Sequence, residues 1–248
     1  MTMVVFIMKQ ITTAQFNGVI YNIVVMDEAS IATVPGIDMT VCSLYNHAYA
    51  THASFVDERE VRERHWHFKP GDVVLDVGAA FGSYAITAAL QGAVVYAFEP
   101  NLFCRSILEE NIAVNPEFPI QVVSLGLHEK SGWFDPDANV FSDDQINQGC
   151  LKVISLDEME SSDINERIDM IKLDVEGGEL SVLRGAEKTI RKHLPRLLIE
   201  EHEFKSSGIG TECEKFLQGI GYGTPVRFPH HSVSHSFYES PRGDQRRC

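Results

Sequence analysis

The sequence predicts an α/β protein built on a doubly wound, mostly parallel sheet. Short, continuous apolar runs recur between residues 73 and 199, as expected for strands that are covered on both faces. Segments with helical periodicity separate these runs, and such alternation is typical of parallel βαβ units. The first run ends in an acid followed by small residues, which is the form of a turn that approaches a ligand closely.

The first half of the chain divides into an extension and a regular core. Residues 1–57 are rich in β-branched residues and turn signals, so we expect a small β-rich N-terminal extension there and a main domain at 58–248. The expected elements that follow are a short charged helix at 58–67, a turn at 69–72, a strand at 73–77, a helix at 83–90 ended by Gly92, a strand at 94–98, a helix capped by Asn101 that runs to about 114, and a strand at 120–125.

The second half is less regular at its start. The segment 128–150 is polar, and we expect irregular structure in it. The remaining expected elements are a strand at 170–173, a helix from about 176 to 193, a strand at 197–199, a helix at 211–219 and two weaker strands near 226 and 237.

Composition narrows the class of protein. The 248 residues suffice for one large core, and the net charge of −14 disfavours a broad nucleic-acid-binding surface. Five widely spaced cysteines without a CxxC pair suit a reducing compartment. No stretch approaches the ~20 apolar residues of a membrane span, and the apolar run at 3–8 lacks the basic start of a signal peptide. We therefore expect a cytoplasmic protein without a membrane partner.

The turn after the first strand of the core decides between two ligand classes, dinucleotides and S-adenosylmethionine. The dinucleotide fingerprint G-x-G-x-x-G, laid on Gly78, requires glycines where this chain has Ala80 and Ser83. The pattern acid-x-G-x-G-x-G fits better, because Asp76, Gly78 and Gly82 match and only Ala80 departs. An acid at this place can accept hydrogen bonds from an ammonium group, whereas a pyrophosphate has no use for it. The turn therefore predicts S-adenosylmethionine as the cofactor.

The ends of the next two strands complete the expected cofactor site. Glu99 follows Gly78 by 21 residues, and its carboxylate can accept both ribose hydroxyls. Two leucines after the third strand would flank the adenine. The expected cofactor-binding residues are Asp76, Gly78, Ala79, Gly82, Ser83, Glu99, Pro100, Asn101, Leu125 and Leu127.

Acidic residues and a histidine follow the fourth and fifth expected strands. Asp174 ends one of them, and Glu200, Glu201 and His202 end the other. Because side chains alternate along a strand, Glu200 and His202 share one side and Glu201 takes the other. We expect His202, with an ordinary pKa of ~6.5, to act as general base while Asp174 or Glu201 orients it or the acceptor. A divalent-metal site of Asp174 with Glu200 and Glu201 is the alternative.

Two further acids, Glu176 and Glu179, open the helix after the fourth strand. Acids at a helix N-terminus complement its dipole at about 0.3–1 kcal/mol each, and this structural role is the one that we favour for both.

Taken together, these stretches resemble the FkbM-type S-adenosylmethionine-dependent methyltransferases. The resemblance covers roughly residues 58–203 and rests on VVLDVGAAFGSYAI, VVYAFEPN, ISLDEM, IDMIKLDVEGGELSVLRGA and PRLLIEEH. Family members typically have alanine where Gly178 stands and asparagine where Ala80 stands. The resemblance implies a class I methyltransferase fold, Rossmann-like, with seven strands of which the last is antiparallel. It also implies O-methylation of a hydroxyl on a sugar or natural product, with Asp76, Gly78 and Glu99 among the cofactor-binding residues.

Several alternatives stay open. One is N-methylation of a small molecule, and another is a degenerate methyltransferase fold that acts as a non-catalytic binding module. A nicotinamide-dependent oxidoreductase fits less well because its fingerprint fails, and the Asn/Asp-Pro-Pro-aromatic and Pro-Cys motifs of base-methylating enzymes do not occur. The expected partner is a small-molecule or sugar acceptor held by residues 1–67 and 128–150, with no nucleic acid. A homodimer and Mg²⁺ as a second cofactor are left open.

Overall fold

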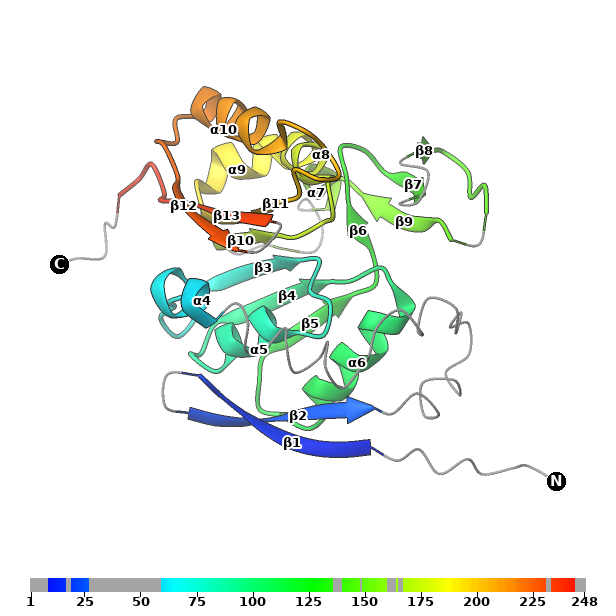
Figure 1. Ribbon diagram of the computed structural model, residues 1–248, viewed down its shortest axis with the longest axis vertical. Helices are drawn as coiled ribbons and strands as arrows, with labels where there is room; N and C mark the ends of the chain where they lie inside the picture. The colour runs from blue at the N-terminus through cyan, green and yellow to red at the C-terminus, as the bar shows by residue number, and fades with distance from the viewer. Residues whose placement is uncertain are drawn as a thin grey trace.

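The computed structural model describes residues 9–16, 19–26, 59–135, 140–147, 149–159, 164, 167–230 and 233–243. Its core is a seven-stranded sheet with helices on both faces (Figure 1). The strands of this sheet are β3 (Val73–Val77), β4 (Val94–Phe98), β5 (Ile120–Val123), β10 (Ile168–Leu173), β11 (Arg196–Glu201), β12 (Val226–His230) and β13 (Val233–Tyr238).

The strand order of the sheet is β12-β13-β11-β10-β3-β4-β5. Only β13 runs against the others, because it pairs antiparallel with both β11 and β12. The four remaining pairings, from β11 across to β5, are parallel. The expected doubly wound sheet, with seven strands and an antiparallel last strand, is therefore confirmed.

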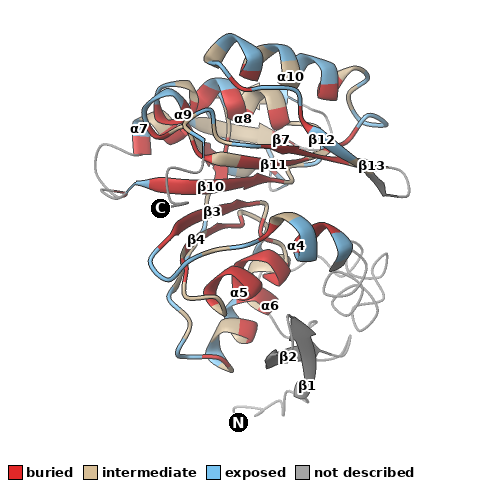
Figure 2. Cartoon of the chain, turned by 90° about the vertical axis from the view of Figure 1, so that its left-hand side faces the viewer, coloured by how far each residue is buried: buried red, intermediate tan, exposed pale blue. Residues whose placement is uncertain are grey.

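The helices form a layer on each side of the sheet. Figures 1 and 2 show α4, α5 and α6 on one face and α7 to α10 on the other. Their bounds are α4 (Arg59–His65), α5 (Ser83–Ala89), α6 (Leu102–Ala113), α7 (Leu156–Met159), α8 (Glu179–Gly185), α9 (Glu187–His193) and α10 (Ile209–Ile220).

Each face of the sheet has its own apolar core, because side chains alternate along the strands. Leu75 of β3 and Ile171 of β10 belong to the cluster under α8 and α10, whereas Val74 and Met170 belong to the cluster under α5. Every residue of β3 and β10 is buried as a result. Burying a Val, Leu, Ile or Met side chain stabilises a fold by about 1.5–3 kcal/mol, and this explains why the sequences of these strands are mostly apolar.

The segment 128–150 differs from the expectation of irregular structure. It contributes β7 (Gly132–Asp135) and β8 (Val140–Ser142) to a second, four-stranded sheet in the order β6-β9-β7-β8. The other two members are β6 (Gly126–Leu127) and β9 (Leu151–Ile154). Figure 1 shows this small sheet beside the carboxyl edge of the main sheet. Its strand β6 follows shortly after the end of β5 and so connects the two sheets. Strands of two to four residues are too short to give a periodic sequence signal.

The helix expected from about 176 to 193 is two helices in the structure. Gly177 has φ +103, so the helical conformation begins only at Glu179. Ala186, between α8 and α9, has φ −115 and ψ 9, which is not helical. The structure therefore corrects both the start and the continuity of this element.

At the N-terminal side, β1 (Lys9–Phe16) and β2 (Val19–Met26) form an antiparallel pair, and β2 lies against α6. The rest of the expected extension, residues 1–8, 17–18 and 27–57, lies outside the described residues. Among the helices that the structure describes, none combines the length and the hydropathy needed to cross a bilayer.

Candidate active site

Two glycines with positive φ shape the turn after β3. Gly78 has φ +78, and a Cβ there would lie 1.7 Å from the carbonyl oxygen of Asp174. Gly82 has φ +93, and a Cβ there would lie 2.6 Å from a methyl carbon of Leu108 on α6. Ala80, between them, has φ +48, a left-handed conformation that alanine rarely adopts. The turn thus lies between α6 and the end of β10, and the backbone of Asp174 leaves no room for a side chain at Gly78, whereas a side chain at Gly82 would have to displace the Leu108 methyl group.

Glu99, just after β4, closes this turn from the side. Its two carboxylate oxygens accept hydrogen bonds from the backbone N–H of Ala80 at 2.9 Å and of Asn101 at 2.8 Å. Burial raises the pKa of Glu99 to about 7, although the two backbone donors act to lower it. Each carboxylate oxygen has a further lone pair, so Glu99 can also accept the two hydroxyls of a ribose.

The other expected cofactor residues surround the same turn. Ala79 and Ser83 are buried, and the side chain of Asn101 caps α6 by accepting the N–H of Phe103 and Cys104. Pro100 lies against the backbone at Gly126. Leu125 and Leu127 pack on the apolar cluster beneath α8 and α10. Their expected contact with adenine stays a prediction.

A buried lysine lies between the two aspartates of the site. Lys172 is 3% exposed, and its Nζ lies 3.0 Å from Oδ2 of Asp174 and 3.9 Å from Oδ1 of Asp76. The same Nζ lies 4.6 Å from the centre of the Tyr84 ring. Sequence reasoning missed Lys172, although a lysine inside the apolar run IDMIKL was a usable signal. A strand buried on both faces tolerates a lysine only when its charge has partners.

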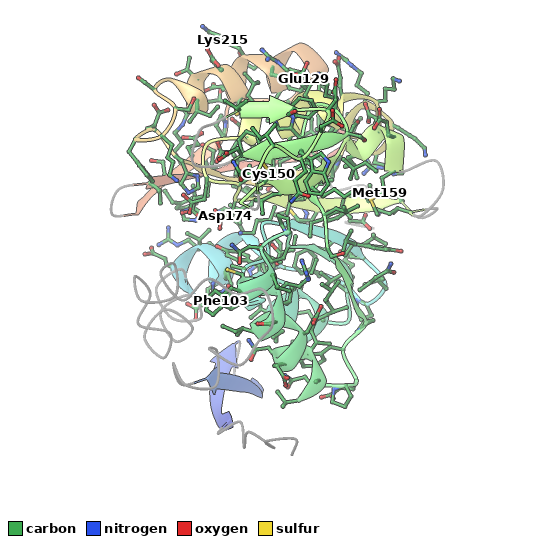
Figure 3. All side chains as sticks on the ribbon, turned by 90° about the vertical axis from the view of Figure 1, so that its right-hand side faces the viewer. Phe103, Glu129, Cys150, Met159, Asp174 and Lys215 are labelled. Carbon is green, nitrogen blue, oxygen red and sulfur yellow. The ribbon has the colours of Figure 1, made fainter. Side chains whose placement is uncertain are left out.

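His202 lies among four carboxylates. Its Nδ1 is 2.7 Å from Oε1 of Glu179, a fully buried residue on α8. Its Nε2 is 3.7 Å from Oδ1 of Asp174, 3.9 Å from Oε1 of Glu176 and 3.9 Å from Oε1 of Glu200. Figure 3, which views the carboxyl edge of the sheet, shows Asp174 at the junction of the two halves of the molecule. We call these five side chains the acid–histidine cluster.

The acids set the charge of the ring. Burial acts to lower the pKa of His202, but the hydrogen bond to Glu179 and the charge of Asp174 outweigh it and raise this pKa to about 9. The expected pKa of ~6.5 for a general base is therefore wrong here, because a ring with a pKa of about 9 is protonated at neutral pH. For Asp174, burial acts to raise the pKa, but Lys172 and His202 outweigh it and hold the pKa below its usual value.

Glu201 lies apart from the acid–histidine cluster. Its carboxylate accepts a hydrogen bond from Ser236 and has Nε of Arg227 at 3.8 Å, on the side of the strand that faces α10. Glu200, its neighbour, points to the cluster instead. The structure thus separates Glu201 from Asp174 and His202, with which sequence analysis had grouped it as a catalytic residue or metal ligand. Alternation along β11 is the reason.

Comparison with known proteins identifies the family. The family described as "Methyltransferase FkbM domain" matches residues 76–223, which include the turn after β3 and the acid–histidine cluster. The chain belongs to the FkbM methyltransferase domain family. It is an S-adenosylmethionine-dependent methyltransferase of the FkbM type, as the sequence resemblance implied.

Three curated methyltransferases are similar to this chain. Hexuronic acid methyltransferase AglP of Haloferax volcanii is 34% identical over 128 residues, which are 48% of this chain and 52% of that protein. The 31-O-demethyl-FK506 methyltransferase FkbM of Streptomyces tacrolimicus is 28% identical, over 62% of this chain and 74% of its own. Methyltransferase sdnD of Sordaria araneosa is 24% identical, over 60% of this chain and 73% of its own.

Solved structures support the fold. The crystal structure of methyltransferase FkbM from Methylobacillus flagellatus KT has a TM-score of 0.54 and 21% identity, and the match spans 69% of this chain but only 44% of that one. The 16S rRNA N2 G1207 methyltransferase RsmC of T. thermophilus, solved with AdoMet and guanosine, has a TM-score of 0.50 and 15% identity, over 94% of this chain and 50% of that one. The comparisons support S-adenosylmethionine as the cofactor and give no support to Mg²⁺.

Proposed function

We propose that this FkbM-type methyltransferase transfers the methyl group of S-adenosylmethionine to a hydroxyl of a sugar or another small molecule. The observation that carries the proposal is the contact between the two halves of the site. The carbonyl of Asp174 fills the place where Gly78 would carry a side chain, so the cofactor turn adjoins the acid–histidine cluster. The acceptor class is supported by two relatives, one named for hexuronic acid and one for the 31-O-demethyl form of FK506.

The cofactor would be held by an acid of β3 and an acid that directly follows β4. We assign the ammonium group of the methionine part to Asp76, whose charge is shared with Lys172 at 3.9 Å. We assign the two ribose hydroxyls to Glu99, whose carboxylate is already oriented by two backbone N–H groups. These assignments leave Asp174 and His202 for the acceptor.

When bound, S-adenosylmethionine would supply a methyl group that is already activated on a sulfonium, with the sulfur as the leaving group that keeps the electron pair of the broken bond. Asp174 is suited to take the proton of the acceptor hydroxyl. Its low pKa is no obstacle, because the hydroxyl becomes a strong acid as its oxygen bonds to carbon. The protonated His202, 3.7 Å from Asp174, would hold the carboxylate and the acceptor in place. Such positioning can supply about 7–11 kcal/mol of the barrier reduction.

Two measurements test this proposal in sequence. Calorimetric titration should show binding of S-adenosylmethionine and S-adenosylhomocysteine but not NAD, and absence of binding would favour the binding-module alternative. Transfer of a labelled methyl group should then be screened over uronic acids, neutral sugars, polyols and amines, because an amine acceptor would favour N-methylation.

Variants test the assigned residues once an acceptor is found. Asp174→Asn and His202→Ala should each lower turnover by at least about 100-fold while the Kd for S-adenosylmethionine changes less than about threefold. Glu109→Gln, on the exposed side of α6, is the control and should leave both unchanged. Full turnover in the two site variants would remove these residues from the mechanism.

A further inference from the structure

One nitrogen of the buried His202 has no hydrogen-bond partner among the described residues. The ring is 3% exposed, and only Nδ1 makes a hydrogen bond, to Glu179. Nε2 points instead at carboxylate oxygens of Asp174, Glu176 and Glu200, at 3.7, 3.9 and 3.9 Å. These separations exceed the roughly 2.7–3.2 Å of a hydrogen bond, so Nε2 faces three acceptors without bonding to any of them.

The three carboxylates share one arrangement. Asp174 turns Oδ2 to Lys172 at 3.0 Å and Oδ1 to His202. Glu200 turns Oε2 to His235 at 3.5 Å and Oε1 to His202. Glu176 turns Oε2 to Lys205 at 3.4 Å and Oε1 to His202. In each case a basic side chain occupies the outer oxygen while the inner oxygen is directed at Nε2.

The inner atoms have the spacing of ligands around an ion. One ligand atom each from Asp174, Glu200 and His202 lies within 4.8 Å of the other two. Ligands on opposite sides of a divalent ion are roughly 4–5 Å apart, given usual metal–ligand bond lengths. Glu179 completes the arrangement, because histidine ligands of metals commonly donate their second N–H to a carboxylate that fixes the ring.

We propose that Asp174, Glu200 and His202 bind a divalent transition-metal ion of the Mn²⁺ or Zn²⁺ type. An imidazole beside two carboxylates suits these ions, whereas Mg²⁺ and Ca²⁺ prefer oxygen ligands alone. The site differs from the Mg²⁺ site that sequence analysis left open, because His202 replaces Glu201, which faces the other side of β11. Coordination replaces the proton on Nε2, so in the metal-bound chain the ion, and no longer the protonated ring, would hold the Asp174 carboxylate and the acceptor in place.

The site itself goes beyond the proposed methyl transfer and does not depend on it. Its use in catalysis does rest on the proposed function. Three protein ligands leave coordination positions open next to the cofactor turn, and an ion there would bind an acceptor through two neighbouring oxygens, as in a vicinal diol or a hydroxy acid.

Titration of the metal-free chain with MnCl₂ alone tests the site, with free Mn²⁺ followed by electron paramagnetic resonance. We expect one ion per chain, displaced by Zn²⁺ and only by a large excess of Mg²⁺. His202→Ala and Glu200→Gln should each weaken binding at least about tenfold. The matched controls His67→Ala and Glu109→Gln, both remote from the cluster, should change binding less than about twofold.

A second measurement needs no variant. Pulsed paramagnetic resonance of the wild-type complex should show ¹⁴N modulation from a coordinated imidazole. Absence of binding up to about 1 mM Mn²⁺, equal binding in the site variants, or a complex without nitrogen modulation would each overturn the proposal. Titration with S-adenosylmethionine in the presence of a chelator distinguishes the metal site from the proposed methyl transfer. Cofactor binding without metal would support the proposed function even if no metal ion binds to the chain.

Discussion

Gly78 and Gly71 have similar backbone angles in different surroundings. Their φ values are +78 and +87, but a Cβ on Gly71 meets nothing within 4 Å whereas one on Gly78 lies 1.7 Å from the carbonyl of Asp174. Gly71→Ala should therefore lower the free energy of unfolding by about 1–2 kcal/mol, the cost of a left-handed alanine. Gly78→Ala should lower it clearly more. Urea denaturation measures both changes. Equal losses would show that the end of β10 can move away from the new side chain without loss of stability.

Glu99 gives the cofactor site a pH dependence. Its pKa of about 7 lies above the usual 4.5, so the carboxyl is partly protonated at about pH 6.5. Ribose hydroxyls donate to the ionised form, so binding should lower this pKa, release protons and become tighter as the pH rises from about 6 to about 8. Calorimetry at about pH 6.5 in two buffers of different ionisation enthalpy measures the release.

The Glu99→Gln variant is the control for this pH effect. It keeps the size of the side chain but cannot ionise, so its weaker cofactor binding should release no protons. Equal proton release in the variant and the wild type would assign the titration to another group.

Among the elements, α9 depends on a residue of α7 for its first hydrogen bonds. The carboxylate of Asp157 accepts the backbone N–H of Lys188 at 3.0 Å and of Thr189 at 2.8 Å, and also the Thr189 hydroxyl. Asp157→Ala should lower the free energy of unfolding by about 1–2 kcal/mol, because these donors lose their acceptor. The exposed Asp143→Ala should change it by less than about 0.5 kcal/mol. Chemical denaturation compares them, and equal effects would contradict the capping role.

Elements bounded by glycine, proline or a capping side chain could be predicted from the sequence closely. The strands Val73–Val77 and Val94–Phe98 have the expected bounds, and Asn101 caps its helix as expected. The site was predictable where it depends on local spacing, as in the turn at Gly78. The charge of His202 could not be predicted from the sequence. It depends on Glu179, which lies 23 residues earlier and reaches the ring only in the folded chain. No local pattern encodes such a contact.

For the whole molecule, the net charge predicts weak binding to RNA, which the fold alone does not predict. RsmC, an rRNA methyltransferase, shares this fold at a TM-score of 0.50, yet this chain has a net charge of −14. We expect its affinity for RNA at physiological salt to be weaker than about 10⁻⁴ M, the weak end of non-specific binding. Fluorescence anisotropy with a labelled RNA measures it, with a basic RNA-binding protein as positive control. Tight, salt-dependent binding would contradict the expectation that no nucleic acid is a partner.

The place of β13 sets the order in which a nascent chain can build the site. β13 lies between β11 and β12 although it follows both in the sequence, and its His235 pairs in register with Glu200. During synthesis on the ribosome, β3, β4 and β10 can therefore find their neighbours early, whereas β11 keeps an open edge until residues 233–238 emerge. The strand that carries Glu200 and leads into His202 thus keeps one edge open until β13 pairs with it, and a chain interrupted before residue 233 would have the cofactor turn and all five cluster residues but no strand beside Glu200 on that edge.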